Sequence, residues 1–168
     1  MVRLWSRLGV AVPSVFGQLE AVEQRVELSA DAMIHMRGYR QMSVRATEAG
    51  GQLFGTITPQ LIRVSKATGP YPADERSRYR YRSNPASAQR AVQKQFQAGL
   101  LYLGEWHTHA EDHPDASSLD DEAMRLLLKR SQLNSNALLM LIVGRKTTID
   151  SIALWTIAPN RIYQWALE

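Results

Sequence analysis

The run LLMLIV, residues 138 to 143, constrains the fold of this chain more than any other segment. It contains no polar residue, whereas a strand with one face in water alternates polar and apolar side chains. We therefore expect a strand covered on both faces, inside a sheet with further layers of structure on each side. A chain of 168 residues can bury one substantial core but not two, so we expect a single domain over residues 1–168.

Three segments carry the signals of helices. Ser29 can cap a helix over residues 30–42, the Asn84-Pro85 pair begins a second that Gly99 stops, and Ser117 or Ser118 begins a third that runs to about residue 131. Apolar residues follow the first two starts at helical spacing, namely Ala32, Met33, Met36 and Tyr39, and then Ala88, Val92 and Phe96.

Strands are expected between these helices. Residues 22–28 and 100–106 predict single strands, and 50–65 predicts a hairpin that turns at Thr58-Pro59. A second hairpin, 151–167, turns at Pro159-Asn160, and residues 1–17 are expected to form an N-terminal strand or arm. The intervening segment 67–84, rich in proline, glycine and charge, is expected to be a long loop, either functional or mobile. Together these elements predict an α/β fold.

Composition narrows the chemistry and the compartment. The chain contains no cysteine, which excludes disulfides, thiolate metal sites and a cysteine-protease mechanism and favours a cytoplasmic protein. No segment approaches the length of a membrane span. The net charge of +4 reflects basic residues that gather between Arg76 and Arg90, interleaved with tyrosines. They could contact nucleic acid, but we favour a solvated loop on the substrate side.

His107 and His109 are the first candidates for metal ligands. They are two residues apart at the end of a predicted strand, so both imidazoles point to the same face while Thr108 points to the other. Such a pair presets two ligands of a tetrahedral metal, although a His-x-His pair alone is weak evidence. His113 could add a ligand, but we expect it on the following loop as a substrate contact or a bystander.

Asp120 strengthens this interpretation. It lies in line with the core-facing residues of the third helix, and a carboxylate turned inward needs a cationic or metal partner. The alternative is a capping box with Ser117, in which the acid serves only the helix N-terminus. The two histidines on the preceding strand favour ligation.

Two imidazoles and one carboxylate would leave Zn²⁺ an open fourth position for water, which is the catalytic rather than the structural pattern. Hydrolysis also needs a general base. Glu105 shares a strand face with both histidines, while Glu48 opens the segment EAGGQLFG, whose glycines allow close backbone approach. These residues leave the choice between the two glutamates open.

The set formed by Glu48 with AGGQLFG, His107-Thr108-His109, and Asp120 preceded by SSL closely resembles the JAMM motif of the MPN (JAB) metalloprotease family. The resemblance implies that His107, His109 and Asp120 bind zinc, that Glu48 is the base, and that Ser117 stabilises the oxyanion. It also implies a mixed sheet flanked by helices, similar to cytidine deaminases. Ala110 and Ala116 stand where the family usually has proline, which puts the loop conformation in doubt.

Within the family, LYLGEWHTH and the Arg-Tyr segment resemble a compact bacterial branch found beside CBASS anti-phage systems. Its members are deubiquitinase-like isopeptidases that release a CD-NTase from the protein to which its C-terminus has been joined. The alternatives are a peptidase that processes a ubiquitin-like or sulfur-carrier protein, and a non-catalytic scaffold or nucleic-acid-binding domain. Because the cysteine ligands are missing, the His-x-Glu at residues 109–111 does not indicate a zinc deaminase.

Overall fold

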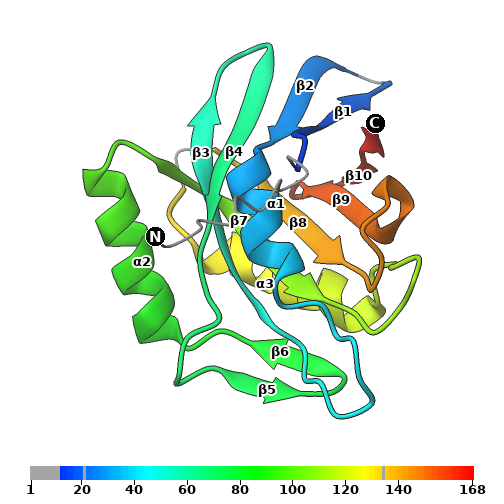
Figure 1. Ribbon diagram of the computed structural model, residues 1–168. Helices are drawn as coiled ribbons and strands as arrows, with labels where there is room; N and C mark the ends of the chain where they lie inside the picture. Colours follow the sequence, from blue (N-terminus) through cyan, green and yellow to red (C-terminus); the bar gives the residue numbers. More distant parts are fainter. Residues whose placement is uncertain (1–11, 21, 134) are drawn as a thin grey trace, which may run out of the picture.

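The computed structural model describes residues 12–20, 22–133 and 135–168 (Figure 1). Its helices are α1 (Ala30–Arg37), α2 (Pro85–Gln97) and α3 (Ser118–Arg130), with a short 3₁₀ turn at Ile149–Ser151. Its strands are β1 (Val15–Leu19), β2 (Val22–Leu28), β3 (Gly50–Ile57), β4 (Leu61–Ala67), β5 (Glu75–Ser77), β6 (Arg80–Arg82), β7 (Leu101–Thr108), β8 (Leu138–Val143), β9 (Ile152–Ile157), β10 (Ile162–Gln164) and β11 (Ala166–Leu167).

Nine of these strands form one mixed sheet in the order β10-β9-β8-β7-β3-β4-β2-β1-β11. The pairs β2–β4 and β7–β8 are parallel and the other pairs are antiparallel. All six residues of β8 are buried, which confirms the expected strand covered on both faces. The α/β class and the mixed sheet flanked by helices are confirmed with it.

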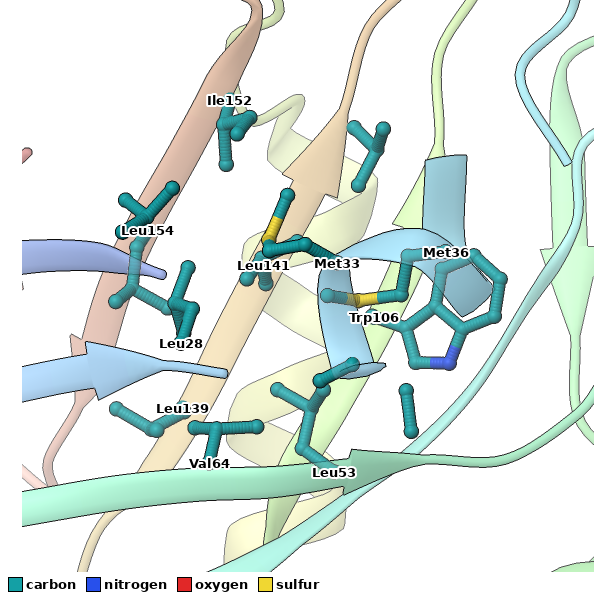
Figure 2. Packing of buried hydrophobic residues seen from close by; sticks show 14 of the residues in the cluster. Leu28, Met33, Met36, Leu53, Val64, Trp106, Leu139, Leu141, Ile152 and Leu154 are labelled. Carbon is teal, nitrogen blue, oxygen red and sulfur yellow. The ribbon is translucent and has the colours of Figure 1, made fainter. Parts of the chain in front are cut away.

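The two faces of the sheet carry separate apolar clusters. On one face, Met33 and Met36 of α1 point toward Leu141 and Trp106 of the strands beneath (Figure 2). On the other face, Met124 of α3 packs with Met140 and its neighbours. The site described below lies where β3 begins and β7 ends.

A bulge interrupts the pairing of β3 with β7. Leu53 is opposite Gly104 but Phe54 is opposite Tyr102, so Leu103 is the additional residue. Gly104 has a φ of +153°, and a Cβ at this position would collide with the backbone oxygen of Leu139 on β8. The close approach of β8 to β7 therefore requires glycine here.

The first helix is shorter than expected, ending at Arg37 rather than at 42, so Tyr39 lies beyond it with 39% of its surface exposed. The chain leaves the helix at Gly38 because Gln41 is held elsewhere. The Gln41 amide nitrogen donates to the carbonyl of Arg78 at 2.9 Å, and its oxygen accepts from the Thr108 hydroxyl at 3.2 Å. These tertiary hydrogen bonds override the helical periodicity of the sequence.

The second helix begins as predicted, with the Asn84 side chain accepting from the amide of Ser87 at 3.0 Å. Its apolar positions do not form its buried face, because Phe96 is 64% exposed while Ser87 and Gln95 are buried. Ser87 and Gln95 line a cleft with Thr68 and Tyr71, so the helix turns a polar side toward its neighbours.

The segment 67–84 is not the plain loop that its composition predicted. It contains the antiparallel pair β5–β6, a separate two-stranded sheet that we call the insertion hairpin, residues 75–82 (Figure 1). The expected N-terminal arm lies partly outside the described residues, which begin at 12, and β1 follows at Val15. Among the described residues, no helix combines the length and the apolar character needed to cross a membrane.

Candidate metal centre

The histidine pair is presented by the end of β7 and its continuation. Gly50 of β3 pairs with His107, the Thr108 amide donates to the Ala49 carbonyl at 2.8 Å, and the His109 amide donates to the Val143 carbonyl at 3.0 Å. The strand is thus fixed on both sides up to His109. Thr108 points to the opposite face and is fully buried, so the two imidazoles share a face as predicted.

The donor atoms of His107, His109 and Asp120 converge on one point. The Nε2 atoms of the two histidines are 3.1 Å apart, and the Asp120 carboxylate oxygens lie 3.2 Å from His107 Nε2 and 3.5 Å from His109 Nε2. A tetrahedral ion with ligands at about 2.0–2.1 Å requires ligand atoms roughly 3.3 Å from one another. The three groups therefore fit three of the four ligand positions of a tetrahedral metal site.

Capping and convergence on the histidines are compatible at Asp120. Its Oδ2 accepts from the Ser117 amide at 2.8 Å and from the Ser117 hydroxyl at 2.7 Å, and the Asp120 amide donates back to that hydroxyl at 3.2 Å. This is the capping box considered above. The helix cap thus holds the carboxylate in place while Oδ1 and Oδ2 face the imidazoles.

Interactions within the cluster favour a negative charge on Asp120 and a positive charge on His109. Burial alone would raise the pKa of the Asp120 carboxyl, but hydrogen bonds from His107 and His109 hold it well below its usual range. Burial would likewise lower the pKa of His109, yet Asp120 and nearby carboxylates raise it. The second ring nitrogen of His109, Nδ1, lies 3.6 Å from the Glu111 carboxylate, which can orient the ring. Sequence reasoning gave Glu111 no role at a metal.

Glu48 borders the same cluster. It lies just before β3, opposite His109, because Gly50 pairs with His107 and Ala49 is hydrogen-bonded to Thr108. The side chain is 7% exposed. Burial raises the pKa of Glu48 to about 7, and the charges of His109, Asp120 and Glu111 act on it. A group with a pKa near neutrality can both accept and return a proton at physiological pH.

Glu105, the competing candidate, is engaged elsewhere. The Gln52 amide donates to one of its oxygens at 3.0 Å and the Tyr102 hydroxyl to the other at 2.7 Å. Burial raises the pKa of Glu105 to about 7 as well. A perturbed pKa therefore does not distinguish the two glutamates, whereas their surroundings do.

His113 is not part of the cluster. Its ring Nδ1 lies 3.3 Å from the Asp150 carboxylate, and the side chain is exposed. Sequence reasoning did not identify Gln41, Arg76 or Tyr81, which contact the segments around Glu48 and Thr108. No local pattern marks these three residues, because their contacts come from distant parts of the chain.

The family described as prokaryotic homologs of the JAB domain matches residues 35–158. A protein of Escherichia coli strain TW11681 named CD-NTase/cGAS isopeptidase is 30% identical over 131 residues, covering 76% of this chain and 81% of that protein. Proteins of the same name are 35% identical in Vibrio cholerae serotype O1, with 72% of this chain and 77% of that protein covered, and 34% identical in Pseudomonas aeruginosa, with 71% and 77% covered.

The solution structure of protein DSY2949 from Desulfitobacterium hafniense is similar in fold. It superposes with a TM-score of 0.59 over 82% of this chain and 87% of that protein, at 19% sequence identity. At this identity the likeness concerns the arrangement of helices and strands alone.

Proposed function

This chain belongs to the family of prokaryotic homologs of the JAB domain, and from that premise we propose that it is a zinc-dependent isopeptidase of the JAMM type. The observation that carries the proposal is the convergence of two imidazole nitrogens and a carboxylate within 3.1–3.5 Å of one another, as a tetrahedral ion requires. Three relatives named as isopeptidases, at 30–35% identity over most of the chain, support the hydrolysis of an amide bond.

His107, His109 and Asp120 would hold the zinc ion. When bound, it would supply a Lewis acid for the carbonyl and lower the pKa of a water to about 7. The chain's own groups do the rest. Glu48 accepts a proton from the attacking water and returns it to the leaving amine nitrogen. Ser117, whose hydroxyl donates to Asp120 in this structure, is our candidate donor to the oxyanion once substrate binds.

We propose that the substrate is a protein conjugate in which an extended C-terminal tail is joined through an amide to a target. The name of these relatives, CD-NTase/cGAS isopeptidase, points to a CD-NTase as the tail-bearing protein. Its release from its targets would place the reaction in anti-phage signalling.

The test compares two substrates, a CD-NTase and a ubiquitin-like carrier, each fused at its C-terminus to a reporter protein. We expect cleavage of the CD-NTase fusion at the junction, seen as two fragments by mass spectrometry. Cleavage of the carrier alone would instead favour processing of a ubiquitin-like protein.

Two variants test the roles of the residues. Glu48→Ala should retain zinc, measured by mass spectrometry of the metal content, but lose hydrolysis. Asp120→Ala should lose both, because two imidazoles alone bind zinc weakly. Full activity in Glu48→Ala together with none in Glu105→Ala would show that the wrong glutamate was assigned as base.

A further inference from the structure

We propose that the insertion hairpin positions the general base, with Arg76 and Tyr81 as positioning residues for Glu48. This inference rests on the proposed function, in which Glu48 exchanges a proton with the attacking water. It assigns the hairpin a role in the turnover step, separate from any grip on the substrate.

The backbone of Glu48 is held by the hairpin and not by the central sheet. Glu48 precedes β3, which begins at Gly50, so it has no ladder partner of its own. Its amide donates to the carbonyl of Ser77 at 2.8 Å, and its carbonyl accepts from Arg76 Nε at 2.7 Å. Both backbone polar groups of the base are therefore satisfied by β5.

The opposite strand of the hairpin lies beside the base. The Tyr81 backbone amide is among the groups that lower the pKa of the Glu48 carboxyl, against the larger rise caused by burial. The Tyr81 ring lies over Gly50, where a Cβ would come within 2.5 Å of the ring carbons. Glycine at this position thus makes room for the ring beside the base.

A single carboxylate, that of Asp74, connects the residues before and after the insertion hairpin. Asp74 Oδ2 accepts from the amide of Tyr71 at 2.7 Å and from the hydroxyl of Tyr81 at 2.8 Å, while Oδ1 accepts from the amide of Asn84 at 2.7 Å. Three points of the 71–84 segment are held together by one side chain, and Tyr81 is one of them.

The tip of the hairpin is tied to the segment that leads into Glu48. Arg78 donates to the carbonyls of Val44 at 2.7 Å and Ser43 at 3.1 Å, and its own carbonyl accepts from Gln41. Residues 41–48 and 75–82 therefore form one hydrogen-bonded unit around the base.

Loosening this unit should slow turnover more than it weakens binding. A displacement of about 1 Å in a catalytic group can cost roughly a hundredfold in rate. Arg76→Lys removes the Nε donor but retains the charge, and Tyr81→Phe removes the bond to Asp74 but retains the ring. Each should lower kcat about tenfold or more, with KM and zinc content unchanged. Arg80→Lys, on the same hairpin, is the matched control and should retain wild-type kcat.

A second measurement is independent of activity and of the metal. Hydrogen exchange of the Glu48 backbone amide, followed by NMR, should become faster in Arg76→Lys and Tyr81→Phe but not in Arg80→Lys. If both variants keep kcat within twofold of the wild type and leave this amide protected, the proposal is overturned. A wild-type protein without metal-dependent hydrolysis would refute the proposed function instead, and the exchange data would still decide whether the hairpin holds Glu48.

Discussion

Replacing Thr108 by valine should destabilise the protein, because the amide of Ala49 would lose its hydrogen-bond acceptor. Thr108 is fully buried, and its hydroxyl accepts from the Ala49 amide at 3.0 Å and donates to Gln41 at 3.2 Å. Valine has nearly the same shape but neither bond. A buried N–H without a partner costs about 1–3 kcal/mol, and the lost bond to Gln41 adds about 1 kcal/mol. We expect a loss of about 2–4 kcal/mol in the free energy of unfolding.

Urea unfolding followed by tryptophan fluorescence, with a chelator present so that metal binding does not contribute, measures this loss. For a chain of this size the expected fall in Tm is roughly 4–15 °C. Thr108→Ser is the control, since it keeps the hydroxyl and loses one methyl group, at a cost of about 1 kcal/mol. If the valine variant is as stable as the serine variant, packing rather than hydrogen bonding determines stability at this position, and our reasoning is wrong.

Three further predictions concern pH, metal and the second helix. Because the folded-state pKa of Glu105 is raised from 4.5 to about 7, its contribution to stability is full below pH 4.5 and lost by pH 8. The free energy of unfolding should therefore fall across this range by about 2–3 kcal/mol more in the wild type than in Glu105→Gln, as measured by urea titration at several pH values. Removing bound metal with a chelator should lower the Tm of the wild type. If the free metal concentration had been a hundredfold above Kd, the loss in unfolding free energy is about 2.7 kcal/mol, whereas Asp120→Ala should show no change. Phe96→Ser should change stability by no more than about 0.5 kcal/mol, because the ring is 64% exposed; a larger loss in calorimetry would mean that it is covered.

The parts of the fold that could be predicted depend on local signals. The apolar run 138–143 has no alternative to a doubly covered strand, and the caps Asn84 and Ser117 act within one turn of the helices they begin. His107 and His109 share a face because alternation along a strand is a local property as well. The convergence with Asp120 followed from two such local patterns facing each other.

The parts that could not be predicted depend on contacts between distant residues. The early end of α1 depends on Gln41, whose partners Arg78 and Thr108 are 37 and 67 residues away. The insertion hairpin consists of charged and aromatic residues without apolar alternation, so its strands have no hydrophobic pattern to reveal them. The choice between Glu48 and Glu105 is similar, since it depends on which charges surround each carboxylate.

The additional residue in β7 sets the phase of everything that follows it. Leu103 and Trp106 both reach the cluster beneath α1, although an odd number of positions separates them, and this is possible only because the strand gains one residue at the bulge. If the existing residues alternated strictly from Leu103 onward, without the bulge, Trp106 would leave this cluster and both imidazoles would turn toward the apolar layer under α1. The shared face of His107 and His109 therefore depends on one irregularity in the pairing of β3 with β7, several residues before the histidines.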